Sequence, residues 1–147
     1  MGSTLAWSAG LILLYWTSLQ NYDLVFNQYQ DYFRRTSWNT SEMGQVIGDF
    51  AGSVGDPDSA WVLAYPHWVD TRLVGMNAGF PTKDYAIWPE SLPETKVNSH
   101  TKLFLVKPED NAGLEALRLL YPEGVFQMYT SQVEGHDFWM VFVPPKE

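Results

Sequence analysis

The chain has 147 residues, of which 46% are hydrophobic and 16% aromatic, with a formal net charge of −8 and no cysteine. The length is enough for one domain with its own core. The negative charge argues against nucleic acid as a partner, because phosphates are bound by Lys and Arg. The absence of cysteine excludes disulfides, thiolate catalysis and cysteine-type zinc sites. The many aromatic residues are typical of proteins that pack large rings, meet a membrane interface or bind sugar rings.

The amino-terminal stretch is unusually apolar. Residues 4–22 contain no charged side chain, and residues 5–19 are strongly apolar. A complete membrane span needs about 20 apolar residues, and no basic residue or small-x-small site marks a signal peptide. Residues 1–22 therefore predict an apolar helix that is the end of a transmembrane span, with membrane contact through residues 4–22. The alternative is a hydrophobic helix buried in a core or in an oligomer.

The helical pattern continues beyond the apolar stretch. Tyr22, Phe26, Tyr29 and Phe33 recur at helical spacing, with polar and charged residues between them. We expect residues 23–37 to be an amphipathic continuation of the same helix. They open a soluble α/β domain that is expected to cover residues 23–147.

The rest of the chain alternates between helical and strand patterns. Asn39 with Glu42 three residues later predicts a helix start, as in a capping box. Helices are predicted at residues 39–54, 70–78 and 111–121, and strands at 60–65, 83–88, 103–106, 125–129 and 138–143. Residues 89–101 read as a polar loop. This order predicts a three-layer α/β sandwich with a mostly parallel sheet of about five strands and helices on both faces. The last strand is expected to run antiparallel at or near an edge.

The candidate site is the strand, turn and helix of residues 61–79. In α/β sheets, ligands bind where the carboxyl end of a strand meets the start of a helix. His67 and Asp70 lie three residues apart at this turn and could be ligand contacts, a metal pair or an acid/base pair. The structural alternative, which we favour, is that Asp70 caps the following helix while His67 is a partly exposed turn residue.

Arg72 and two tryptophans complete the candidate ligand-binding set. Arg72 lies in the first turn of that helix, where a cation opposes the helix dipole, so it needs a carboxylate or an anionic ligand. A surface salt bridge is the simpler explanation. Trp68 and Trp88 could flank the same crevice and stack on a sugar, although burial is the commoner fate of Trp. No nucleotide or hydrolase motif and no third metal ligand is evident, so neither a catalytic residue nor a cofactor nor a metal is expected.

Three segments together resemble a known family. They cover residues 27–51, 59–89 and 102–124, and the likeness is carried chiefly by YPHWVDTRLVGMNAG followed by KDYAIWP. The chain resembles the carboxyl-terminal soluble domain of bacterial GT-C class membrane glycosyltransferases, of the family 39 or protein-mannosyltransferase-like type. The resemblance implies a polytopic parent enzyme that transfers a sugar from a polyprenyl-phosphate donor outside the cytoplasm. It also implies that the catalytic acid lies in a membrane-proximal loop absent from this sequence.

Three functions remain open from the sequence. The first is a non-catalytic, extracytoplasmic accessory domain of such an enzyme, which could contact the acceptor glycan. The second is a small free-standing α/β enzyme that uses His67 and Asp70 as acid and base. The third is an oligomerisation module whose amino-terminal helix packs against copies of itself.

Overall fold

The computed structural model describes the backbone of residues 2–36 and 38–146, and the side chains of residues 6–32 and 38–146. The chain forms two compact units, Met1–Ser37 and Trp38–Glu147. The division falls at the end of the long helix. Ser37, the last residue of the predicted amphipathic segment, lies outside the described residues, as do the side chains of residues 4, 5 and 33–36.

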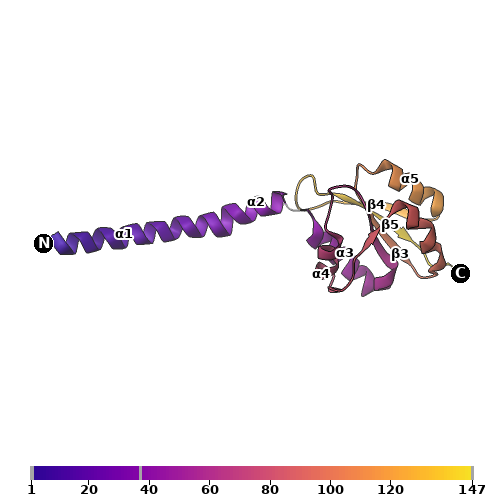
Figure 1. The fold of residues 1–147 in the computed structure, drawn as a ribbon, viewed down its shortest axis with the longest axis horizontal. Helices are drawn as coiled ribbons and strands as arrows, with labels where there is room; N and C mark the ends of the chain where they lie inside the picture. The colour runs from indigo at the N-terminus through magenta and orange to yellow at the C-terminus, as the bar shows by residue number, and fades with distance from the viewer. Residues whose placement is uncertain (1, 37, 147) are drawn as a thin grey trace. The chain divides into compact units, whose positions relative to one another are not determined.

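The first unit is one uninterrupted helix. Helix α1 (Gly2–Tyr22) continues through a π-helical segment, η1 (Asp23–Gln28), into α2 (Tyr29–Thr36), as Figure 1 shows. The helix thus continues beyond Tyr22 as far as Thr36. Asp23 accepts hydrogen bonds from Asn27 Nδ2 at 2.7 Å and from Gln28 Nε2 at 2.8 Å, which lie four and five residues further on. These bonds lower the pKa of Asp23 and match the wider turn of a π-helix.

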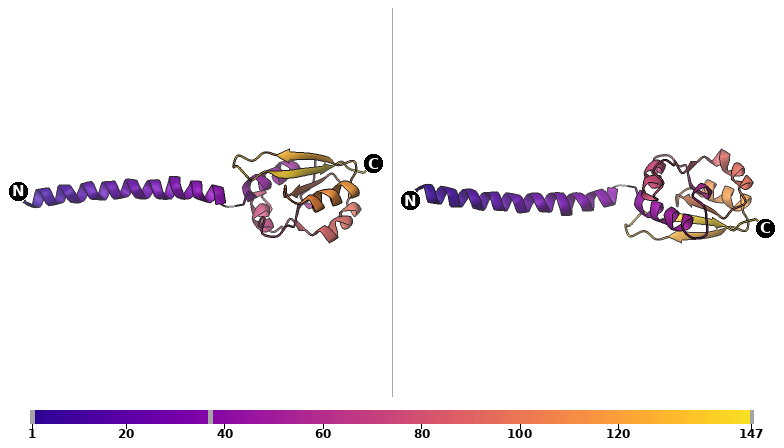
Figure 2. Two further views of the ribbon diagram at one scale, coloured as in Figure 1. Left: turned by 90° about the horizontal axis from the view of Figure 1, so that it is seen from above. Right: turned by 90° about the horizontal axis from the view of Figure 1, so that it is seen from below.

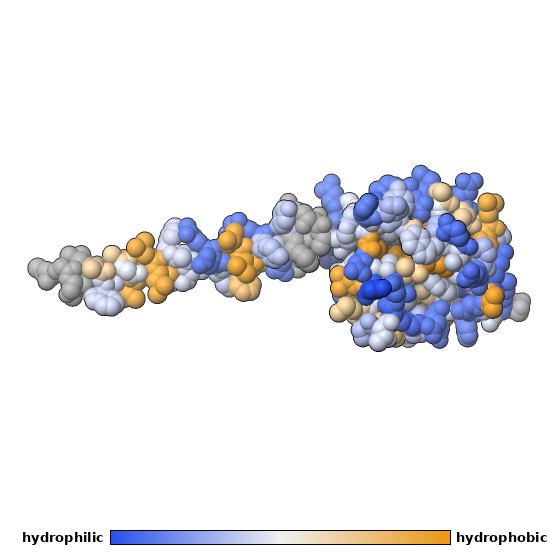
Figure 3. Space-filling view, in the orientation of Figure 1, coloured by the Kyte–Doolittle hydropathy of each residue, from blue (hydrophilic) through white to orange (hydrophobic). Residues whose placement is uncertain are grey.

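Large apolar side chains on this helix face outward. They are exposed at Trp7, Leu11, Ile12, Leu13, Leu14, Tyr15, Trp16 and Leu19. Figure 3 shows apolar surface, in orange, along the helix. Over the part of the chain that the structure describes, no helix combines the length and the apolar character needed to cross a membrane.

The second unit is built on a five-stranded mixed sheet with the strand order β2-β1-β3-β5-β4. The strands are β1 (Ala60–Leu63), β2 (Ala86–Ile87), β3 (Lys102–Val106), β4 (Val125–Tyr129) and β5 (Phe138–Val143). Strand β1 pairs in parallel with β2 and β3, whereas β5 pairs antiparallel with both β3 and β4. The predicted α/β class is confirmed, and the last strand lies one position from the edge.

The two faces of the sheet bury separate core clusters. Leu103 and Leu105 of β3 belong to one cluster, and Phe104 and Val106 belong to the other, as the two-residue period of a strand requires. Helices α3 (Thr40–Ala51) and α4 (Thr71–Asn77) supply the first cluster. Helix α5 (Asn111–Leu120) and the 3₁₀ helix η3 (Pro89–Val97) supply the second, and they lie side by side in Figure 2.

Two predicted elements differ from the observed ones. The expected loop at 89–101 contains η3, whose Leu92 and Thr95 are buried three residues apart. A 3₁₀ helix repeats every three residues, and this one contains two prolines. The spacing that identifies an α-helix in a sequence therefore does not predict it. The strand expected at 83–88 is reduced to β2. A short 3₁₀ turn, η2 (Pro57–Ser59), precedes β1.

The second unit also buries a lysine. The side chain of Lys102, at the start of β3, has no exposed surface, and its Nζ donates to the carbonyl oxygen of His100 at 3.0 Å. The same atom lies 5.7 Å from the centre of the Tyr121 ring. Burial lowers the pKa of Lys102, because a charged ammonium is disfavoured away from water.

Candidate functional site

The turn that follows β1 forms the wall of a surface hollow. His67 is exposed and has a φ of 55°, a left-handed conformation that residues other than glycine adopt rarely. It lines a hollow of about 430 Å³ together with Tyr65, Trp68, Thr71 and Trp88. This volume falls within the roughly 300–1,000 Å³ of small-molecule sites.

The two tryptophans of the candidate set have different environments. Trp68 is only 6% exposed and belongs to the core cluster beneath α3 and α4. Little of its ring is therefore available to a ligand, and Trp68 has the burial that is the commoner fate of tryptophan. Trp88, in contrast, is 65% exposed. It is the only member of the pair whose ring presents a broad surface to solvent.

Asp70 is a helix cap. Its Oδ1 accepts the backbone N–H of Arg72 at 3.0 Å and that of Leu73 at 3.2 Å, at the start of α4. The favoured structural interpretation of Asp70 is thus confirmed, as is the exposure of His67. Asp70 does not line the hollow that His67 lines. The arrangement does not supply the convergent acid and base that the enzyme hypothesis requires.

Arg72 forms the predicted surface salt bridge. Its Nε lies 3.2 Å from Asp84 Oδ2, and the two side chains are 82% and 44% exposed. Asp84 also accepts the Thr71 hydroxyl at 2.5 Å and the Ala86 backbone N–H at 3.1 Å. The Thr71 hydrogen bond is the main cause of a lowered pKa at Asp84, and the bonds from Ala86 and Arg72 act in the same direction. Asp84 therefore joins the start of α4 to the start of β2.

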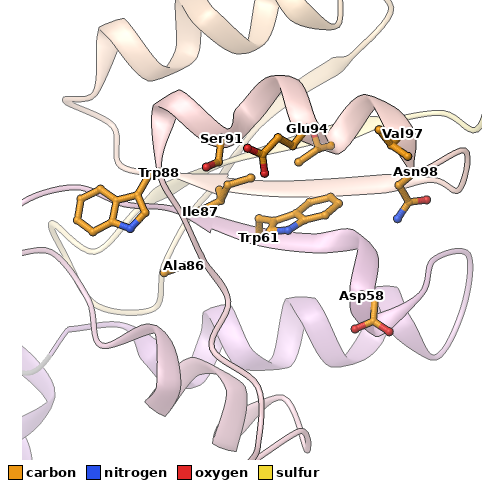
Figure 4. Close-up of a pocket in the computed structure, with 10 residues that line it drawn as sticks. Asp58, Trp61, Ala86, Ile87, Trp88, Ser91, Glu94, Val97 and Asn98 are labelled. Carbon is orange, nitrogen blue, oxygen red and sulfur yellow. The ribbon is translucent and has the colours of Figure 1, made fainter.

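A second hollow lies on the other side of Trp88. Its volume is about 530 Å³, and its lining residues are Asp58, Trp61, Ala86, Ile87, Trp88, Ser91, Glu94, Thr95, Val97 and Asn98. Figure 4 shows Ser91, Glu94 and Val97 along η3, with Trp61 across from them and Trp88 at one end. Ala86 and Trp88 line both hollows, so the edge strand β2 separates them.

The candidate residues therefore fall into two groups. The structure brings His67, Trp68 and Trp88 together around one hollow, while Asp70 and Arg72 take part in helix capping and an ion pair. The second hollow is also lined by Trp61, Glu94 and Asn98, which were not predicted from the sequence as site residues. The available signal was the three-residue spacing of Ser91, Glu94 and Val97, which places them on one face of a 3₁₀ helix.

The lining of the two hollows resembles that of small-molecule binding sites. Among the residues that the structure describes, no three His, Asp or Glu side chains gather in a way that could hold a metal ion. Both hollows are lined by indole rings with a few polar groups around them, which is a typical composition for sites that bind small organic ligands.

Comparisons with known proteins give no relative. No family model, no curated protein and no solved structure matches this chain. The resemblance to membrane glycosyltransferases stays a prediction from the sequence.

Proposed function

We propose that this chain is a non-catalytic, extracytoplasmic accessory domain of a membrane glycosyltransferase that uses a polyprenyl-phosphate sugar donor. Residues 4–22 would contact the membrane as the end of a transmembrane span, and the second unit would contact the acceptor glycan. The observation that carries the proposal is the exposed apolar surface of α1. The glycan contact is supported by the exposed ring of Trp88 and by the hollow of about 530 Å³ that this ring lines together with Trp61.

The apolar surface of α1 surrounds the helix axis. Leu11, Ile12, Leu13 and Leu14 are consecutive and between 65% and 67% exposed. Successive residues of an α-helix point about 100° apart, so four in a row cover the whole circumference. A helix that is apolar on all sides is normally covered by protein or lipid. Each such side chain gains roughly 1.5–3 kcal/mol on full burial.

We also infer that the second unit is a three-layer sandwich. The separate core clusters on the two faces of the sheet support this arrangement, with α3 and α4 contributing to one cluster and α5 and η3 to the other. Such an architecture leaves the ends of the strands open for ligands. Catalysis by the proposed parent enzyme would reside in its membrane portion.

Vesicle flotation tests the membrane part of the proposal. The full chain is mixed with phosphatidylcholine vesicles and compared with a variant carrying Leu11→Asp and Leu14→Asp. A matched control is Leu119→Asp, which changes a 79% exposed leucine in α5 of the second unit. We expect the native chain and the control to float with the vesicles and the double variant to stay in the aqueous fraction.

Two outcomes would contradict the proposal. One is a native chain that remains monomeric in buffer and does not float. The other is a discrete oligomer in vesicle-free buffer that the double variant dissociates, because this result would make α1 an oligomerisation helix. Light scattering on the same samples distinguishes these outcomes.

A further inference from the structure

We infer that the second hollow, between the β1–β2 edge and η3, is a binding site for a neutral sugar residue of a glycan. The inference rests on the proposed function, since it takes glycan as the class of ligand. It places the sugar in a hollow that contains neither His67 nor Asp70 nor Arg72. Trp88 is the one residue of the sequence-based candidate set that lines it.

The 3₁₀ geometry of η3 builds one wall of this hollow. Residues three apart eclipse one another in a 3₁₀ helix. Ser91, Glu94 and Val97 therefore form one stripe, and all three line the hollow. Leu92 and Thr95 form the neighbouring stripe, which is buried, and Thr95 also borders the hollow. With a rise of about 2 Å per residue, the stripe from Ser91 to Val97 extends over roughly 12 Å.

The buried stripe holds this wall in place. The Thr95 hydroxyl donates to the Leu92 carbonyl oxygen at 2.6 Å and also lies 2.6 Å from the Tyr121 hydroxyl. The Tyr121 ring in turn packs against Phe104 of β3, with ring centres 5.7 Å apart. The helix that forms the wall is thus connected to the centre of the sheet through Thr95 and Tyr121.

Two indole rings supply the apolar surfaces. Trp61 stacks on Phe104 with ring centres 5.1 Å apart and an angle of 20° between the planes, which fixes the orientation of its indole. Trp88 lies between the end of β2 and the start of η3, where Pro89 restricts the backbone. The C–H faces of pyranose rings stack on indole faces, whose π-systems carry partial negative charge.

Hydrogen-bonding groups lie beside these rings. The Asn98 side chain is held at both ends, since its Nδ2 donates to Ser59 Oγ at 2.7 Å and its Oδ1 accepts the His100 backbone N–H at 2.8 Å. One N–H and one lone pair of this amide remain for a ligand. Glu94 offers carboxylate acceptors for sugar hydroxyls, and Ser91 offers a group that can both donate and accept.

The charge of the lining selects against anionic ligands. Asp58 and Glu94 are its charged members, and both are acidic. Asp58 is paired with Lys83, so its charge is partly compensated, whereas Glu94 faces the solvent. A phosphate or a carboxylate ligand would meet repulsion here, while a neutral polyol would not. The lining therefore favours an uncharged glycan residue over a phosphorylated sugar donor.

The test is a binding titration of the full chain in zwitterionic detergent micelles. Saturation-transfer NMR is applied with methyl glycosides of mannose, glucose and galactose and with N-acetylglucosamine, while mannose 1-phosphate and choline serve as the charged probes. We expect saturable binding of at least one neutral sugar, no binding of the anion mannose 1-phosphate, and weaker binding of the cation choline than of the sugar. Trp88→Ala should weaken that binding by about ten-fold or more, and Glu94→Gln by about five-fold.

The matched control distinguishes the two hollows. His67→Ala removes an exposed side chain that lines only the first hollow, so it should leave the affinity unchanged. The inference is overturned if His67→Ala weakens binding while Glu94→Gln does not, or if choline or mannose 1-phosphate binds in preference. It is also overturned if folded native chain, checked by circular dichroism, binds no sugar. Vesicle flotation is independent of all these results, so failure of the sugar site and failure of the membrane proposal are separable.

Discussion

Asp84 is the residue whose removal gives the most informative stability test. Its carboxylate accepts three donors, from Thr71, Arg72 and Ala86. Hydrogen bonds such as those from the hydroxyl and the backbone amide each contribute about 0.5–1.5 kcal/mol net. The ion pair with Arg72 adds about 0–1 kcal/mol, because the Arg72 side chain is 82% exposed. We therefore expect Asp84→Ala to lower the free energy of unfolding by about 1–4 kcal/mol.

The effect of Asp84 should depend on pH in a defined direction. The pKa of its carboxyl is lowered in the folded chain from the ordinary value of 3.8, chiefly by the Thr71 hydroxyl. A lowered folded-state pKa means that the contribution is complete above the unfolded pKa and is lost as the pH falls toward the folded pKa. The stability gap between the native chain and Asp84→Ala should therefore be constant near pH 7 and narrow below about pH 4.

Urea unfolding followed by near-ultraviolet circular dichroism measures this gap, because the aromatic core belongs to the second unit. Arg72→Ala should lower the free energy of unfolding by no more than about 1 kcal/mol. Glu115→Ala, at an exposed position on α5, serves as a neutral control. A gap below about 0.5 kcal/mol at pH 7, or one that widens on acidification, would refute the role assigned to Asp84.

Three further substitutions have clear expectations in the same unfolding assay. Gly75→Ala places a Cβ 2.3 Å from the carbonyl oxygen of Lys83, so it should lower the free energy of unfolding by about 1–3 kcal/mol. Unchanged stability would refute this close approach. Asp70→Ala removes the cap of α4 and should lower the free energy of unfolding by about 1 kcal/mol. Asp70→Asn keeps a capping side chain and should retain most of that stability. Lys102→Met replaces a buried charge by an apolar chain of similar length, so stability should stay the same or rise; a large loss would instead indicate an essential ammonium.

Local signals account for the parts of the fold that the sequence predicted. Strands β4 and β5 have the predicted bounds, since each is a short run rich in aromatic and β-branched residues next to turn residues. Asn39 and Asp70 both cap helices through their side chains, as their positions before apolar periodic segments indicate.

Long-range packing decided what the sequence could not show. The position of β5 between β3 and β4 depends on pairing across the sheet, which no local pattern encodes. Trp68 is buried, and the residue before it, His67, has a left-handed backbone conformation. A histidine in a sequence does not predict this conformation. The second hollow combines Trp61 with residues more than thirty positions later in the sequence, so only the folded chain reveals it.

The π-helical segment of the first unit has a consequence for how that helix could associate. A two-stranded coiled coil needs one apolar seam that returns every 3.5 residues along the whole helix. The wider turn at η1 (Asp23–Gln28) changes the phase between the side chains of α1 and those of α2. A seam that begins on α1 therefore leaves the interface after Tyr22, so the two ends of the helix are suited to different neighbours.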